Sequence, residues 1–154
     1  MASKLEVELE LKSDVEKMWK NFKEFTKLFP KALPHLYEGI AVAEGDGISA
    51  GTIFISTLKP TDPSNPVVSI NKERIDSLDD EKKILTYSYI EGEILKSYKN
   101  LKGTVSMSSN NGDGTIFKYV VEFDKANAQV PDPLLFKDFL VMVFQGFDDY
   151  VLNA

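Results

Sequence analysis

The residues in this sequence that could do chemistry are few and far apart. Lys118 and Glu122 would suit the proton transfers of a condensing enzyme. They alternate with the apolar residues Tyr119 and Val121, and this alternation directs both charged side chains to the solvent face of a strand. His35 is the only histidine, and the chain has no cysteine. We therefore expect no catalytic residue, no metal site and no cofactor.

Two further patterns have conformational explanations. The glycines at 45, 47 and 51 suggest a phosphate-binding loop, but no Gly-Lys-Ser or Gly-Lys-Thr follows them and the next element is strand-like. A hairpin loop is the favoured interpretation. The acidic pairs at 79–80 and 148–149 have no supporting cluster of ligands and are expected to be solvated. His35 either contacts a ligand at a cavity mouth or, as we favour, lies at the surface.

Composition excludes several classes of protein. The 154 residues carry a net charge of −6 without a basic run, which disfavours binding to nucleic acid or to an anionic membrane. The longest unbroken apolar run, Phe139 to Phe144, is far shorter than the roughly 20 residues of a membrane-spanning helix. No signal peptide is visible. These features predict a single domain over 1–154, located in the cytoplasm and most simply a monomer, with a dimer as the alternative.

The hydrophobic pattern predicts an α+β fold. Period-two alternation marks a strand over 4–12, and a capping box at Ser13 and Glu16 starts a helix. Thr26 is expected to cap a second short helix over 27–33. A long, largely apolar helix over 133–152 follows the N-cap Asp132, with Pro133 in its first position. Between these helices we expect antiparallel strands at 36–44, 51–58, 67–78, 83–92, 97–108 and 115–124.

Several short segments resemble the birch-pollen-allergen superfamily of plants. They are LFPK at 28–31, EGDG at 44–47, GTI at 51–53, KERID at 72–76 and YSYIEG at 87–92. EGEIL at 91–95, followed by YK at 98–99, is more similar to the major-latex-protein branch of that superfamily. The resemblance covers essentially the whole chain in the expected order.

The resemblance implies a helix-grip fold, in which a curved, seven-stranded antiparallel sheet wraps around a long C-terminal helix and two short helices follow the first strand. It also implies an internal cavity. Members of this family are mostly described as intracellular carriers of apolar plant metabolites, hormones and steroids, with links to defence or stress. A minority, similar to norcoclaurine synthase, do chemistry in the same cavity with an inward lysine, inward acids and a tyrosine.

The strand register implied by the resemblance places apolar residues and a few polar ones, including Ser56, Lys72 and Arg74, on the concave face. A dry core would not tolerate unpaired polar groups there, whereas a cavity could. The alternative is that Lys72 and Arg74 extend to the sheet edge and pair with acids. We expect the ligand to be oriented by Tyr87, Tyr89, Tyr119 and Arg74. The remaining predicted contacts are Tyr37, Phe54, Ile70, Leu101, Val105, Phe139 and Val143.

The sequence therefore favours a carrier for an apolar, ring-bearing small molecule. Two alternatives stay open. One is an isomerase or cyclase of specialised metabolism that uses the same cavity, which an inward lysine or acid with a shifted pKa would favour. The other is a storage or interaction protein whose interior is simply packed.

Overall fold

The computed structural model describes residues 3–60 and 70–154. Within these residues one sheet has the strand order β1-β7-β6-β5-β4-β3-β2, and all neighbours are antiparallel. Strands β1 and β2 form its two edges. The strands are β1 (Ser3–Leu11), β2 (Tyr37–Glu44), β3 (Ile53–Leu58), β4 (Ile70–Asp79), β5 (Ile84–Gly92), β6 (Tyr98–Ser109) and β7 (Thr115–Lys125).

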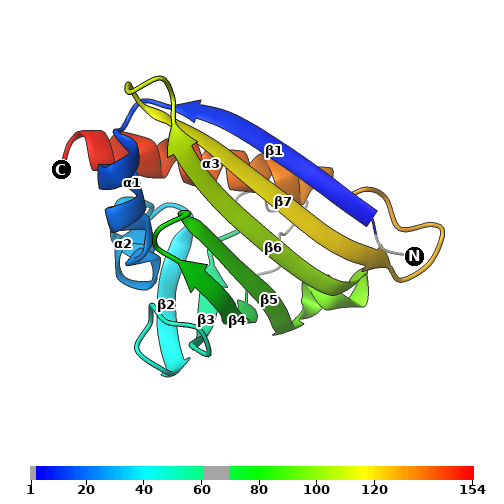
Figure 1. Cartoon of the computed structure of the whole chain (residues 1–154). Coiled ribbons are helices and arrows are strands. Elements are labelled where there is room, and N and C mark those ends of the chain that lie inside the picture. The colour runs from blue at the N-terminus through cyan, green and yellow to red at the C-terminus, as the bar shows by residue number, and fades with distance from the viewer. Residues whose placement is uncertain (1–2, 61–69) are drawn as a thin grey trace.

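Three α-helices complete the fold. Helices α1 (Val15–Phe22) and α2 (Phe25–Ala32) connect the two edge strands, and α3 (Leu134–Leu152) ends the chain. Figure 1 shows α3 running behind the long strands β1, β7 and β6, with α1 and α2 near its C-terminal end. The predicted α+β helix-grip fold is confirmed. Strand boundaries differ from the expected ones by three residues or fewer, and residues 67–69 of the expected fourth strand lie outside the described residues.

The helix starts differ from the predicted ones. Asp14, not Ser13, caps α1, and its carboxylate accepts hydrogen bonds from the backbone N–H groups of Glu16 and Lys17. Helix α2 begins at Phe25, before the predicted cap Thr26. Helix α3 begins at Leu134, and Asp132 binds Lys125 at 2.6 Å instead of capping the helix. A short 3₁₀ helix, Glu93–Lys96, joins β5 to β6 and was not predicted.

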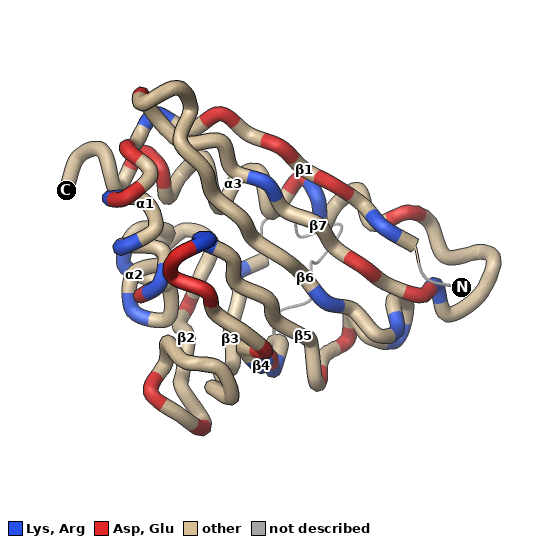
Figure 2. Tube along the Cα trace, viewed as in Figure 1, with Lys and Arg blue, Asp and Glu red and all other residues tan. Residues whose placement is uncertain are grey.

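Charged side chains lie on the outer face of the sheet, as the alternation predicts. Figure 2 shows acidic residues spaced along β1. Lys118 lies 4.0 Å from Glu6, and Glu122 lies 3.7 Å from Lys4, with all four side chains at least partly exposed. These residues therefore form no acid/base pair in the interior. Among the described residues, no helix combines the length and the apolar character needed to cross a membrane.

Aromatic packing holds α3 against α1 and α2. Phe22 and Phe29 lie 5.8 and 5.9 Å from the ring of Phe144 on α3, and Phe29 lies 4.9 Å from Phe147. The ring of Phe117 on β7 contacts Phe144 at 4.1 Å. These close ring pairs bury the C-terminal half of α3 between the sheet and the two short helices.

A buried carboxylate attaches the same half of α3 to the start of the chain. The side chain of Asp148 is 5% exposed and accepts hydrogen bonds from the backbone N–H groups of Lys12, at 2.8 Å, and Ser13, at 3.0 Å. The Ser13 carbonyl in turn accepts a bond from the Thr115 hydroxyl at 2.8 Å. Asp148 therefore provides hydrogen-bond acceptors for the backbone N–H groups between β1 and α1, where no strand partner is available. The predicted solvation of this acid is wrong, because the sequence could not show its distant partners.

We expect Asp148→Ala to lower the free energy of unfolding by about 2–4 kcal/mol, because it leaves one buried and one partly buried backbone donor without an acceptor. Urea denaturation followed by circular dichroism measures the change. The exposed neighbour Asp149 provides the matched control, and Asp149→Ala should change the stability by less than about 0.5 kcal/mol. Equal effects of the two substitutions would contradict the role given to Asp148.

Candidate ligand-binding site

An internal cavity lies between the concave face of the sheet and α3. The cavity has a volume of about 70 Å³, which is room for several water molecules. Its walls come from all three α-helices and from every strand except β1. The lining residues are Phe22, Phe25, Phe29, Tyr37, Ile40, Phe54, Ser56, Leu58, Asn71, Glu73, Leu85, Tyr87, Tyr89, Val105, Tyr119, Phe139, Leu140, Val143 and Phe144.

Most of the residues predicted to contact a ligand line this cavity. The predicted residues that do so are Tyr37, Phe54, Tyr87, Tyr89, Val105, Tyr119, Phe139 and Val143. Leu101 is buried in the apolar core but is not a lining residue, so it contributes packing and no cavity surface. His35 is exposed and does not line the cavity.

The prediction for β4 is wrong, because this strand turns its other face inward. Ile75 is completely buried and Glu73 is 6% exposed, whereas Ile70 is 56% exposed. Arg74 is exposed and pairs with Asp76 on the outer face at 2.8 Å. Since side chains alternate along a strand, burying Ile75 also brings Asn71 and Glu73 inward and turns Ile70 and Arg74 outward.

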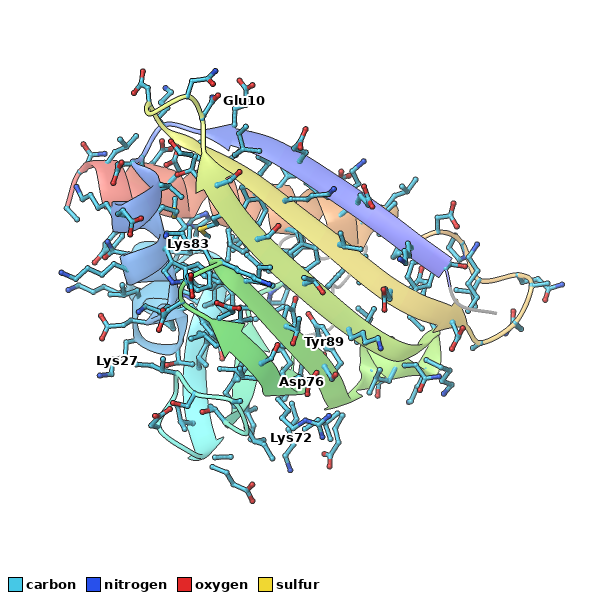
Figure 3. All side chains as sticks on the ribbon, viewed as in Figure 1. Glu10, Lys27, Lys72, Asp76, Lys83 and Tyr89 are labelled. Atoms are coloured by element: carbon cyan, nitrogen blue, oxygen red, sulfur yellow. The ribbon has the colours of Figure 1, made fainter. Side chains whose placement is uncertain are left out.

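Lys72 follows the same rule. Its ammonium group lies 3.9 Å from the exposed carboxylate of Glu91 on β5, so the alternative of an outward lysine paired with an acid is correct. Figure 3 labels Lys72 and Asp76 on β4 and Tyr89 on the neighbouring strand β5. The cavity wall formed by β4 therefore carries an acid where a base was expected.

Glu73 is the polar centre of this wall. The hydroxyl of Ser56 on β3 donates a hydrogen bond to its carboxylate at 3.0 Å. Burial raises the pKa of Glu73 from 4.5 to about 8, although hydrogen bonding from Ser56 and Tyr89 lowers it in part. No lysine, arginine or histidine is among the lining residues, so the described part of the cavity supplies no cation to compensate the acid.

Four tyrosines line the same cavity as the carboxyl group. The hydroxyls of Tyr87 and Tyr119 are hydrogen-bonded to each other. Burial is the main cause that raises the pKa values of Tyr37, Tyr87 and Tyr89, and the negative charge of Glu73 adds to the increase. The phenols therefore stay protonated and offer rings and hydroxyl groups to a ligand.

Gly103 on β6 makes room for these rings. A Cβ atom at this position would lie 2.5 Å from the Tyr119 hydroxyl oxygen and 2.8 Å from a ring carbon of Tyr87. Both distances are below van der Waals contact, so any larger residue would displace the tyrosine pair. The pair contributes to the cavity only because this strand position has no side chain.

The loop between β2 and β3 binds its own aspartate. The carboxylate of Asp46 accepts bonds from the backbone N–H groups of Ile48, at 2.8 Å, and Ser49, at 2.7 Å. These bonds, with one from the Ser49 hydroxyl, lower the pKa of Asp46 to about 2. Gly45, Gly47 and Gly51 have positive φ, as expected for a hairpin loop. The donors that a phosphate would need are already occupied.

Sequence reasoning missed Asn71 and Glu73, as well as the cavity role of the aromatic residues on α1 and α2. Phe22, Phe25 and Phe29 repeat at a spacing that is typical of a buried helix face, and such spacing carries no information about a cavity beside that face. An acid within the apolar alternation of KERID was the available signal for Glu73. It was ambiguous because basic residues flank this acid on both sides.

Comparisons with known proteins agree with the resemblance seen in the sequence. The model of the pathogenesis-related protein Bet v 1 family matches residues 1–154. MLP-like protein 423 of Arabidopsis thaliana is 40% identical over 149 residues, which cover 97% of this chain and 94% of that protein. The family and the fold together support a ligand-binding protein.

Two solved structures share the fold. Ginseng major latex-like protein 151 from Panax ginseng superposes with a TM-score of 0.87 at 24% identity, covering 98% of both chains. Norcoclaurine synthase from Thalictrum flavum, solved in complex with dopamine and hydroxybenzaldehyde, gives a TM-score of 0.82 at 22% identity, covering 100% of this chain and 88% of that one.

The buried acid should make stability depend on pH. The folded state holds the Glu73 proton up to about pH 8, whereas the unfolded chain releases it near 4.5, so stability falls as pH rises through this window. Replacing the acid by an amide removes the cost of burying the charge. We expect Glu73→Gln to match the wild type at about pH 4 and to exceed its unfolding free energy by on the order of 3 kcal/mol at about pH 9.

Chemical denaturation across this pH range measures the difference. Glu91→Gln is the matched control, because Glu91 is an exposed acid on the neighbouring strand. Parallel pH profiles of wild type and Glu73→Gln would show that the carboxyl is not held in a water-poor environment.

Proposed function

The chain belongs to the pathogenesis-related protein Bet v 1 family, and from this membership together with its cavity we propose that it is an intracellular plant carrier for apolar, ring-bearing small molecules. Hormones, steroids and secondary metabolites are the candidate ligands. A role in defence or stress is part of the proposal and is supported by the family's description as pathogenesis-related.

The observation that carries this proposal is the composition of the cavity wall. Aromatic and aliphatic side chains make up most of it, and a few polar groups converge from β3, β4 and β5. This is the usual make-up of a small-molecule site, in which apolar burial provides affinity and a few polar atoms fix the orientation. Each Å² of apolar ligand surface removed from water contributes roughly 25 cal/mol before the costs of association.

The cavity must enlarge to accept such a ligand. A pocket for a drug-sized ligand measures roughly 300–1,000 Å³. This range exceeds the volume of about 70 Å³ of the cavity here. The first turn of α3 is the most weakly packed part of the helix, since Leu134 and Leu135 are 57% and 60% exposed, whereas Val143 and Phe147 further along are buried. We therefore propose that ligand entry displaces the N-terminal half of α3 and leaves the C-terminal half fixed.

An isomerase or cyclase remains the second candidate, and Glu73 is the observation in its favour. A carboxyl with a pKa near 8, inside a cavity and beside tyrosine hydroxyls, is suited to general acid/base catalysis at neutral pH. The lining residues include no lysine to join it. The two functions separate in one measurement: a carrier returns its ligand unchanged, whereas an enzyme converts it and loses turnover, but not binding, in Glu73→Gln.

Phenylnaphthylamine, a neutral fluorescent ring compound, should bind the wild-type protein. Val143→Phe should weaken that binding by about tenfold or more, because the new ring occupies part of the cavity from α3. Fluorescence titration measures the affinity, and the melting temperature confirms that the variant is folded. Val42→Phe is the control, because Val42 is 42% exposed on β2 and does not line the cavity.

Two outcomes would count against a carrier. If neither phenylnaphthylamine nor any apolar compound of a plant extract raises the melting temperature of the wild type, the interior is packed and serves storage or interaction instead. If Val143→Phe binds as tightly as Val42→Phe, the probe binds elsewhere on the protein.

A further inference from the structure

The cavity wall has an excess of hydrogen-bond acceptors. Glu73 is buried with two hydroxyl groups as its hydrogen-bonding neighbours and without a cation among the lining residues. Its carboxylate has room for about four hydrogen bonds when ionised. The acid is therefore only partly satisfied by the described residues.

A second acceptor lies on the same face of β4. Asn71 is 6% exposed, and its side-chain oxygen is buried without a hydrogen-bond partner among the described residues. It packs close to Gly92 on β5, where a Cβ atom would lie 2.4 Å from this oxygen. Residues two apart on a strand share a face, so Asn71 and Glu73 line the same wall.

Aromatic side chains from several elements line the same cavity as these acceptors. Tyr37 comes from β2, Tyr87 and Tyr89 come from β5, and Tyr119 comes from β7. The faces of aromatic rings attract cations, most strongly where water is excluded. A buried acid without a counter-ion, in a cavity lined by aromatic rings, suits an organic ammonium group.

Building on the proposed carrier function, we infer that the cavity selects a ring-bearing ligand whose polar end is a protonated amine, in preference to the same ring bearing a hydroxyl or a carboxylate. The ammonium group supplies the missing positive charge and up to three hydrogen-bond donors. A hydroxyl supplies one donor and no charge. A ligand carboxylate would place a second acid beside Glu73 with no cation to balance either.

Binding of an amine should release a proton. In the empty cavity Glu73 is mostly protonated at about pH 7, because its pKa is raised to about 8. The ligand arrives as an ammonium ion and keeps its charge, and the Glu73 carboxyl gives its own proton to the solvent to form the ion pair. The other titratable groups that line the cavity are the four tyrosines, from β2, β5 and β7. The lining residues from the remaining elements have no further ionisable side chain.

Three probes with one ring system test the inference. They are naphthylethylamine, naphthylethanol and naphthylpropionate, each titrated into the wild-type protein by isothermal calorimetry at about pH 7. We expect the amine to bind about tenfold more tightly than the alcohol, and the carboxylate to bind most weakly. Repeating the amine titration in two buffers of different ionisation enthalpy should show release of nearly one proton at about pH 7 and almost none at about pH 9.

Glu73→Gln provides the decisive variant, because it keeps the shape of the side chain and removes its charge. The amine should lose about tenfold in affinity and its proton release, whereas the alcohol should change by less than about threefold. Glu91→Gln removes an exposed acid from the same sheet and should leave all three affinities unchanged.

The failures of the two proposals are distinguishable. If the alcohol or the carboxylate binds at least as tightly as the amine, or if Glu73→Gln keeps the preference for the amine, the inference is wrong and the carrier function stands. If none of the three probes binds, both the inference and the proposed carriage of ring compounds are wrong.

Discussion

The attachment of α3 at its C-terminal end determines how the interior is divided. Asp148 binds the backbone after β1, and Phe144 and Phe147 pack against the rings of α1 and α2. These contacts fill the space below that half of the helix with side chains. The first half of α3 has longer ring contacts, at 6.0 Å from Phe136 to Tyr89 and 6.3 Å from Phe139 to Tyr37, and Leu134 and Leu135 at its start are exposed. A helix held firmly at one end can leave a cavity beside its middle without loss of the overall fold.

The alternation of side chains along β4 explains why polar groups lie on the inner wall opposite that helix. Strand β4 must bury Ile75, and the alternation of side chains then brings Glu73 and Asn71 inward with it. The Ser56 hydroxyl on β3 donates a hydrogen bond to the carboxyl group, and tyrosines on β2, β5 and β7 line the same cavity. The packing of the sheet and the electrostatics of the cavity therefore both follow from which face of β4 turns inward.

Most of the fold could be predicted because its signals are local. The hairpin between β6 and β7 contains Asn111-Gly112, both with positive φ. The long C-terminal helix was evident from the apolar residues along its sequence. The wrong cap of α1 has a cause in the tertiary structure. Ser13 has the right residue type for a cap, but its backbone binds Asp148, which is 135 positions away. Local patterns cannot show such a partner, so the cap moved to Asp14.

The face of β4 could not be predicted for a different reason. Residues 70, 72 and 74 and residues 71, 73 and 75 each combine one isoleucine with two polar side chains, so alternation does not distinguish the two faces. The neighbouring strands decide between them, and the chosen face buries an acid without a cation. Such burial costs free energy that a neutral residue would spare. Glutamine would satisfy the same alternation without an ionisable group, so the side-chain pattern of β4 does not by itself account for the acid.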